Sequence, residues 1–220
     1  MQRKSAILVA AHHHFAHHGF RGASLRDIAR DAEVSLTLLN HHFGSKQQLL
    51  SAVIDCHRGR LREWARALEA LKAAPAGTVT VRELVQTIIR IGFETAADPN
   101  GQEFLLLLAR ITDDPSDASM QDVLESLDDA ACLFMDALQQ CYPGATRHAA
   151  ASAYLCCSGA LLKFLVGSGR LGRLAASPPS LDRLAENKAR LASFLVSGIE
   201  AALQSPSVTD ADALETLAIV

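Results

Sequence analysis

The chain has 220 residues, of which 49 % are hydrophobic, so it can bury a sizeable core without disulfides or metal ions. Its five cysteines are scattered and form no Cys-x-x-Cys pair, which argues against a disulfide framework or a zinc knuckle and favours a cytoplasmic protein. The apolar runs at 104–109 and 130–135 are far too short to span a bilayer, so we expect no membrane partner.

The net charge of −3 hides an uneven distribution along the chain. Through residue 66, ten Lys and Arg stand against five Asp and Glu, which leaves +5, while the remainder carries −8. Eight of the nine histidines also lie in the first part. A basic end joined to an acidic body is typical of a protein in which one module touches phosphate groups and another does not.

We predict an all-α fold, because apolar residues recur at helical spacing and β-branched alternation is nearly absent. The first helix should run from about 4 to 18 and end at Gly19, which tolerates left-handed geometry. Ser24 should begin the second helix, with Asp27 reaching back to it in a short capping box. Ser35 should cap a third helix.

A longer fourth helix is expected next. Ser45 and Gln48 can cap its start, and it should continue to about Leu71, before a Pro-Ala-Gly sequence that marks the domain boundary. Residues 1–50 are therefore predicted to form an N-terminal three-helix domain, with 46–74 as a connecting helix.

A helical bundle is predicted for residues 78–204, and 205–220 should form a loosely ordered tail. Turn sequences separate its expected helices, which are 80–97, 102–112, 114–143, 146–166 and 181–204.

The most informative pattern is a pair of short helices around a tight turn at 24–43, which reads SLRDIARDAEVSLTLLNHHF. A helix-turn-helix needs a small residue where the helices cross, a turn four residues later and a large apolar residue that fixes the angle. Ala29, Glu33 and Leu39 stand at these places. The spacing therefore favours a helix-turn-helix domain.

The stretch from about Ile7 to Leu50 resembles the amino-terminal domain of the TetR/AcrR family of transcription regulators. The resemblance is carried by Ala10-Ala11, Phe15-Ala16, Gly19-Phe20, Ser24-Leu25-Arg26-Asp27-Ile28-Ala29, Val34-Ser35 and Leu39-Asn40-His41-His42-Phe43-Gly44-Ser45-Lys46. It covers about a fifth of the chain. For 78–204 it implies a helical bundle that dimerises and encloses a ligand cavity.

Three features depart from the family's usual pattern. Glu33 stands at the turn, where the family usually has glycine, so it either adopts a left-handed conformation or the turn is built differently. Asn40 replaces a tyrosine that touches DNA. His12 and His14 occupy first-helix positions that usually hold apolar residues facing the core.

The predicted recognition helix, 36–42, contains neither Arg nor Lys, so other groups must read bases. Thr37 can contact a thymine methyl group or donate a hydrogen bond, and Asn40 and His41 offer donors. Arg26, near the start of the preceding helix, is the best candidate to read guanine.

Other polar residues should hold the DNA backbone. Ser24, His42 and Lys46 match positions that anchor phosphates in the family, and we count Ser35, the recognition-helix cap, with the DNA-binding residues. One short helix reads only a few base pairs, so we expect a homodimer on a pseudo-palindromic operator.

The last two predicted helices carry apolar stripes that could form a four-helix dimer interface, although an internal core is an equally good interpretation. The stripes are Ala153, Cys157, Ala160, Leu161 and Phe164, and Leu191, Phe194, Leu195 and Ile199.

The ligand pocket is harder to predict. The apolar run 104–108 should be fully buried or line the cavity, and Arg110 could pair with an anionic ligand or with Asp113 or Asp114. The candidate pocket residues are Phe93, Phe104, Arg110, Met135, Tyr154 and Lys163.

Histidines cluster on the first helix, where His13 and His17 are spaced as metal ligands often are. No third ligand is evident nearby in the sequence, so we predict solvated or partly buried histidines and no metal site or cofactor. The sequences typical of hydrolases, metalloproteases and nucleotide-binding enzymes are also missing, so we expect no enzyme.

We therefore expect a homodimeric regulator, and the resemblance to the family implies a repressor that leaves its operator when a small molecule binds the bundle. Two alternatives stay open: a helical small-molecule-binding protein whose altered DNA-reading domain is impaired, and a metal-dependent protein that uses the histidine helix.

Overall fold

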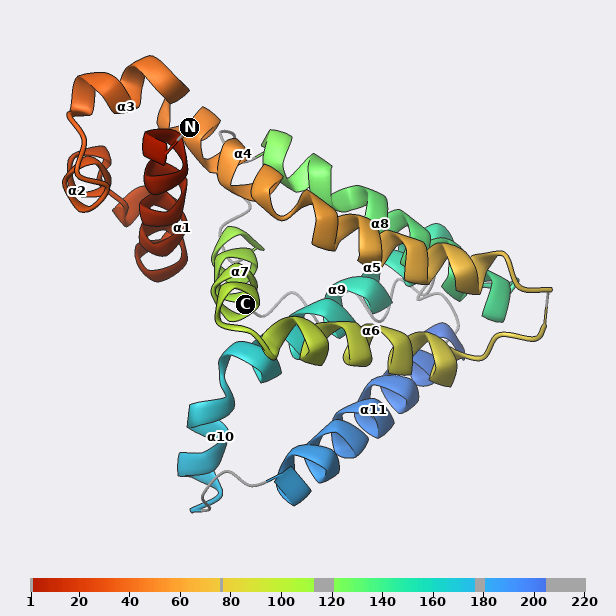
Figure 1. The fold of residues 1–220 in the computed structure, drawn as a ribbon. Helices are drawn as coiled ribbons and strands as arrows, with labels where there is room; N and C mark the ends of the chain where they lie inside the picture. Colours follow the sequence, from red (N-terminus) through yellow and green to blue (C-terminus); the bar gives the residue numbers. More distant parts are fainter. Residues whose placement is uncertain (1, 76, 113–120, 177–180, 205–220) are drawn as a thin grey trace, which may run out of the picture.

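The computed structural model describes residues 2–75, 77–112, 121–176 and 181–204 (Figure 1). The chain forms α1 (Gln2–Gly22), α2 (Leu25–Asp31), α3 (Leu36–Phe43), α4 (Lys46–Cys56), α5 (Arg58–Lys72), α6 (Val81–Ala96), α7 (Pro99–Thr112), α8 (Gln121–Cys141), α9 (Arg147–Val166), α10 (Ser168–Leu174) and α11 (Leu181–Gln204). The described residues contain no strand, which confirms the all-α prediction.

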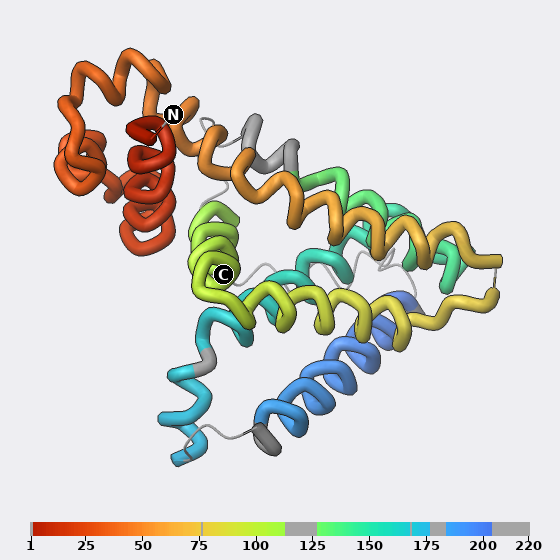
Figure 2. The backbone as a smooth tube through the Cα atoms, in the orientation of Figure 1, coloured from red at the N-terminus to blue at the C-terminus, as the bar shows by residue number. Residues whose placement is uncertain are grey.

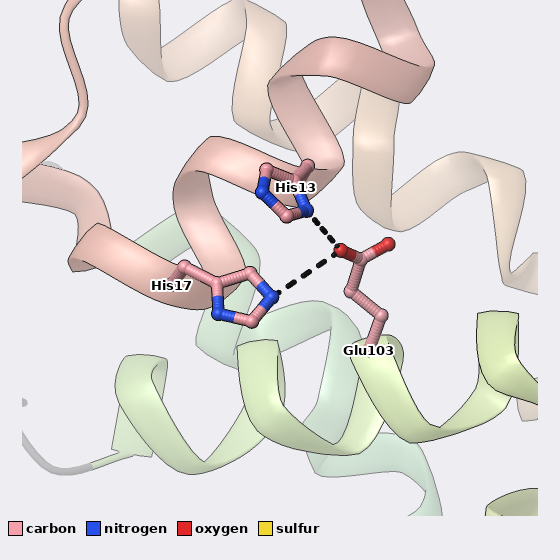
Figure 3. Close-up of side chains that lie close together, drawn as sticks. All are labelled: His13, His17 and Glu103. Atoms are coloured by element: carbon pink, nitrogen blue, oxygen red, sulfur yellow. Dashed lines mark hydrogen bonds and ion pairs between the residues drawn. The ribbon is translucent and has the colours of Figure 1, made fainter.

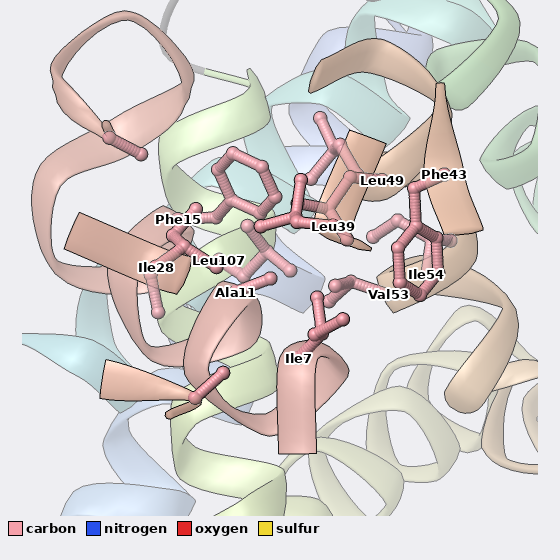
Figure 4. Packing of buried hydrophobic residues seen from close by; sticks show 14 of the residues in the cluster. Ile7, Ala11, Phe15, Ile28, Leu39, Phe43, Leu49, Val53, Ile54 and Leu107 are labelled. Carbon is pink, nitrogen blue, oxygen red and sulfur yellow. The ribbon is translucent and has the colours of Figure 1, made fainter. Parts of the chain in front are cut away.

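Helices α1 to α3 form a small domain, here called the head, at one extremity of the molecule (Figure 1). Its core contains the fully buried Ile7, Phe15 and Ile28 together with Leu39 from α3, and α4 closes it with Leu49 (Figure 4). Helices α5 to α11 are here called the body, and α5, α6, α8, α9 and α11 surround a second core that includes Leu84, Phe134 and Leu138. The two-module organisation therefore follows from two separate apolar clusters.

Helix α7 belongs to both modules. Phe104, Leu107 and Leu108 are buried in the same core as the head residues, and α1 packs directly along α7. Figure 2 shows α7 beside α1, between the head and the rest of the body. Helix α7 therefore joins the head to the body through packed side chains.

The predicted fourth helix is wrong in one respect, because it is two helices rather than one. The chain turns at His57, with φ −98° and ψ 6°, between α4 and α5. The His57 ring is buried and stacks on Phe104 with ring centroids 4.1 Å apart. This contact joins residues far apart in sequence, so helical periodicity could not reveal it.

Two other boundaries also differ from the predictions. The helix predicted at 102–112 begins at Pro99 instead, because Asp98 accepts a hydrogen bond from the Gly101 amide at 2.8 Å and proline suits the first helical position. Helix α10 lies between the predicted helices 146–166 and 181–204, where no helix was expected. The predictions for 114–120 and for the tail at 205–220 lie outside the described residues.

Candidate functional site

The helix-turn-helix is built from α2, α3 and the turn between them. Ala29 is 3 % exposed at the crossing and Leu39 is 1 % exposed on α3, so both occupy the core positions that the motif requires. Glu33 adopts the left-handed conformation, with φ 55°. The amides of Val34 and Glu33 donate to the carbonyl oxygens of Ala29 and Arg30, at 2.9 and 3.0 Å, which is a Schellman turn with glutamate in place of glycine.

The helix starts agree only partly with their predictions. The Ser35 hydroxyl accepts the Leu38 amide at 3.1 Å, and Ser45 and Gln48 form the full capping box of α4. Ser24, by contrast, makes no capping hydrogen bond. Asp27 does not reach back to it because it pairs with Arg30 at 2.6 Å instead.

The predicted base-reading residues all lie on the surface of the head. Thr37, Asn40 and His41 are exposed on α3, and their spacing of three and four residues gives them a common face of the helix. Arg26 is exposed in the first turn of α2. Arg30, whose guanidinium pairs with two carboxylates, is neutralised, whereas no ion pair of Arg26 is found in the described part of the chain.

The predicted phosphate-anchoring residues lie at the ends of α2, α3 and α4. Ser24 is half-buried, and Ser35 and His42 are exposed. The Lys46 ammonium donates to the carbonyl oxygen of Arg21 at 3.3 Å and lies 4.9 Å from the centroid of the Phe20 ring. Lys46 is thus held against the end of α1, beside the start of α4.

A groove of about 1290 Å³ runs along the body between α6, α7, α9, α10 and α11. Phe93 and Phe164 provide aromatic walls with ring centroids 6.3 Å apart, and the Lys188 ammonium lies 4.5 Å from the centroid of Phe93. An apolar wall with a cation beside an aromatic ring suits a small organic molecule that carries an anionic or polar group.

Of the six candidate pocket residues, only Phe93 lines this groove. Phe104 is fully buried between the head and the body, and Tyr154 packs against Phe134 with centroids 5.6 Å apart. Burial raises the pKa of the Tyr154 hydroxyl. Arg110 and Lys163 are exposed away from the groove. The partners suggested for Arg110 lie outside the described residues, and Met135 is half-buried beside the second core.

Sequence reasoning missed the groove residues His17, Glu103 and Lys188. They come from α1, α7 and α11, so no linear pattern connects them. Helical spacing did identify His17 as part of a histidine cluster, but it could not supply its partner.

That partner corrects the expectation that the histidine cluster lacks a third ligand. Glu103 Oε1 lies 2.7 Å from His13 Nδ1 and 3.6 Å from His17 Nε2, across the contact between α1 and α7 (Figure 3). The other carboxylate oxygen of Glu103 lies 3.5 Å from Nδ1 of the buried His12. Burial lowers the pKa of His12, with the Glu103 charge opposing this shift.

The predicted dimer stripes are mostly internal core. Six of the nine residues, Ala153, Cys157, Leu161, Leu191, Leu195 and Ile199, are buried in the second core of the chain itself. Ala160 and Phe164 are half-buried, whereas Phe194 is 69 % exposed. The stripes pack α9 against α11 within one chain, so a dimer surface must be sought on their outer faces.

Helix α9 is long and apolar enough to cross a membrane by length and composition, which apolar run lengths did not reveal. It packs against α6, α7, α8 and α11, and its buried residues are part of the second core. The core helix of a soluble protein can meet the same criteria, so one such helix is weak evidence for a membrane span.

The chain matches two family models. Residues 7–53 match the model of bacterial regulatory proteins of the tetR family, and residues 86–198 match the tetracyclin repressor-like C-terminal domain. The first covers the helix-turn-helix, and the second covers more than half of the chain and all of the groove-lining residues except His17.

Curated relatives and solved structures agree with this match. The HTH-type transcriptional regulator BetI of Rhizobium meliloti (strain 1021) is 41 % identical over 91 residues, which is 41 % of this chain and 42 % of BetI. UidR of Escherichia coli (strain K12), also an HTH-type transcriptional regulator, is 32 % identical over 91 residues, 41 % of this chain and 43 % of UidR. The chain therefore matches about two fifths of the length of these relatives.

A TetR-like transcriptional regulator from Rhodococcus sp. RHA1 shares the fold, with a TM-score of 0.59 and 21 % identity over 89 % of this chain and 96 % of that one. These comparisons do not favour the alternative of a binding protein with an impaired head. Since the family models cover both the head and more than half of the chain, the protein belongs to the tetR family of bacterial regulatory proteins.

Proposed function

We propose that the protein is a cytoplasmic transcription regulator that binds a pseudo-palindromic operator as a homodimer and is released when a small molecule occupies the groove along α7. One observation carries the proposal. Helix α7 packs into the head core with one face and lines the groove with another, so a ligand and the DNA-reading helix act on the same element.

The DNA-binding part of the proposal rests on the surface of the head. In this proposal Arg26 reads a guanine in the major groove and Thr37, Asn40 and His41 on α3 make further base contacts, which is supported by the exposure of all four side chains. Ser24, Ser35, His42 and Lys46, at the ends of α2, α3 and α4, fix the register on the phosphates. The +5 charge of residues 1–66 supplies the nonspecific attraction to DNA.

The dimer is proposed to form through the outward faces of α9 and α11. Leu155 is 67 % exposed on α9 and Phe194 is 69 % exposed on α11. Gly159 and Gly198 follow each of them by four residues, and a Cβ atom added at either glycine would contact nothing. Leu155 and Phe194 offer apolar side chains for a dimer contact, and the neighbouring glycines have no side chain, so helices of a second copy can approach closely.

The release mechanism follows from the position of α7. Leu105 and Leu106 line the groove, whereas the neighbouring Phe104 and Leu107 are fixed in the head core. A ligand between Phe93 and Leu105 displaces α7, tilts both heads and changes the spacing between the two recognition helices. By linkage, operator DNA weakens ligand binding by the same factor as the ligand weakens operator binding.

The test is the binding of purified protein to genomic DNA fragments at two salt concentrations, with an Arg26→Ala, Lys46→Ala double variant. An Arg82→Ala, Arg170→Ala variant, with both changes on exposed positions of the body, is the charge-matched control. We expect selective, salt-sensitive binding to a pseudo-palindrome that the head variant loses and the control retains. Equal binding by all three proteins, or no selective binding at low salt, would overturn the proposal.

A further inference from the structure

The contact between the head and α7 contains three side chains whose donor atoms converge. His13 and His17 are one turn apart on α1, with ring centroids 4.4 Å apart, and Glu103 faces both from α7 (Figure 3). The donor atoms of the three residues all lie within 4.8 Å of one another. Neither α1 nor α7 alone contains this set, so it exists only when the head is docked on the body.

The spacing of these atoms suits a tetrahedral metal ion. Ligand atoms about 2.0–2.1 Å from zinc are roughly 3.3 Å apart along a tetrahedral edge. The two distances from Glu103 Oε1, 2.7 Å to His13 Nδ1 and 3.6 Å to His17 Nε2, lie on either side of that value. The third separation, between the donor atoms of His13 and His17, is no more than 4.8 Å, and rotation of these partly exposed side chains would bring all three donors to the tetrahedral spacing.

The chemistry of the donors also selects the ion. Two imidazoles and one carboxylate favour zinc and its neighbours among the divalent first-row metals over magnesium or calcium, which prefer oxygen ligands. Three protein ligands leave a fourth position for water or another group. The side chains of His13, His17 and Glu103 are 59 %, 47 % and 25 % exposed, so an ion can enter from solvent.

The Glu103 carboxylate has a further contact, on the side away from the His13 and His17 donors, with the buried His12. The second carboxylate oxygen lies 3.5 Å from Nδ1 of His12, whose side chain is buried and whose Nε2 has no hydrogen-bond partner in the described structure. His12 in turn packs edge-on against His57, with ring centroids 4.7 Å apart. A contact that restricts a ligand's carboxylate reduces the cost of ordering it when the metal binds.

We propose that His13, His17 and Glu103 bind a divalent transition-metal ion of the zinc class and that this ion fixes the head to α7. His17 and Glu103 also line the groove, so the ion lies at its rim. The regulatory consequence rests on the proposed function: by fixing the angle between α1 and α7, the ion changes the affinity of the dimer for its operator.

The same helix provides a matched control. His14 and His18 have the same spacing as His13 and His17, and Asp31 supplies a carboxylate 2.8 Å from His14 Nε2. His14 is buried, however, and these residues are not brought together as a set of three donors in the described structure. Replacing His18 therefore removes a histidine of α1 without touching the proposed site.

The binding test uses untagged protein treated with a chelator and then titrated with Co²⁺, whose visible absorption reports tetrahedral coordination, and with Zn²⁺ as competitor. We expect one ion per chain, and an affinity at least about tenfold lower in His17→Gln and in Glu103→Gln but unchanged in His18→Gln. Circular dichroism checks the fold of each variant. No binding by the wild type, or equal binding by all variants, would overturn the site.

The regulatory test measures operator affinity with Zn²⁺ and with the chelator. We expect Zn²⁺ to change the affinity of the wild type at least threefold and that of Glu103→Gln not at all. Metal binding is measured without DNA, and DNA binding is measured in chelator without metal, so failure of the site and failure of the proposed function give different results. Metal binding without any effect on DNA would overturn the regulatory part of the proposal.

Discussion

The Nε2 atom of His14 lies 2.8 Å from the Oδ2 atom of Asp31, and this contact joins the middle of α1 to the last residue of α2. The hydrogen bond from His14 is the largest cause of the lowered pKa of Asp31. It explains how a histidine can occupy a buried position where the family usually has an apolar residue, because its polar atom has a partner at the edge of the core.

Replacement of His14 by alanine is expected to lower the free energy of unfolding by about 2 kcal/mol, since it leaves a cavity and removes the hydrogen bond. Denaturant unfolding measures the change. His14→Leu should restore most of the loss, because Asp31 is 44 % exposed and water can solvate its carboxylate. The exposed His18 serves as control, and an equal loss in His18→Ala would contradict the structural role of His14.

Glu33→Gly is expected to raise the free energy of unfolding by about 1 kcal/mol, because Glu33 holds φ 55° in the turn, a conformation that costs a residue with a Cβ atom about that much. Thermal or denaturant unfolding tests this. Glu33→Ala keeps the Cβ atom and removes only the charge, so it should bring little gain. A gain of equal size in Glu33→Ala would assign the effect to the carboxylate instead of the backbone.

Local patterns predicted the parts of the fold that depend on local interactions. The caps at Ser35 and Ser45 and the core positions Ala29 and Leu39 are as the sequence indicates, because each is set by residues within a few positions. The break at His57 was not predictable in this way. It depends on stacking with a phenylalanine that follows much later in the chain.

The candidate sites show the same difference between local and tertiary interactions. The exposure of Thr37, Asn40 and His41 on α3 could be predicted, since one amphipathic helix determines which positions face solvent, whereas their proposed contacts with bases stay a prediction. Of the proposed metal ligands, only the pair on α1 could be predicted, because helical spacing brings His13 and His17 together. Glu103 meets them through a tertiary contact across 90 residues. The groove likewise draws on several helices, so only Phe93 among the six candidate residues lines it, together with Leu105 and Leu106 of the apolar run 104–108.

The stability of the protein is expected to fall as the pH decreases from about 6.5 to about 4. Burial lowers the pKa of His57 from the ordinary value of 6.5 to about 4. Between these values the unfolded chain takes up a proton that the folded chain does not, so the unfolded state is favoured as pH falls. The full effect is on the order of 3 kcal/mol and is complete below about pH 4.

Denaturant unfolding at several pH values tests this with the variant His57→Phe, which can keep the stack on Phe104 but cannot titrate. The variant should lose stability less steeply than the wild type across this range. His148→Gln, at an exposed position of α9, should follow the wild type. Identical pH profiles for the wild type and His57→Phe would show that His57 does not contribute.

Phe194→Asp is expected to shift the protein from dimer to monomer, because it puts a charge at the centre of the proposed interface, where Phe194 is 69 % exposed in the single chain. Sedimentation velocity measures the change in mass. Leu174→Asp is the control, since Leu174 is 75 % exposed on α10, away from that surface. A dimer that tolerates Phe194→Asp, or one broken equally by Leu174→Asp, would place the interface elsewhere.

Arg26 and Lys46 are expected to affect DNA binding in different ways, because one is proposed to contact a base and the other a phosphate. Arg26→Ala should weaken operator binding by about 1–3 kcal/mol while changing nonspecific binding little, so selectivity falls. Lys46→Ala should weaken binding to all sequences and reduce the slope of log affinity against log salt by about 1. Titrations of operator and scrambled DNA over a range of salt concentrations distinguish the two patterns. If both variants lose affinity uniformly for the two DNAs, Arg26 contacts the backbone, and the bases must be read by α3 alone.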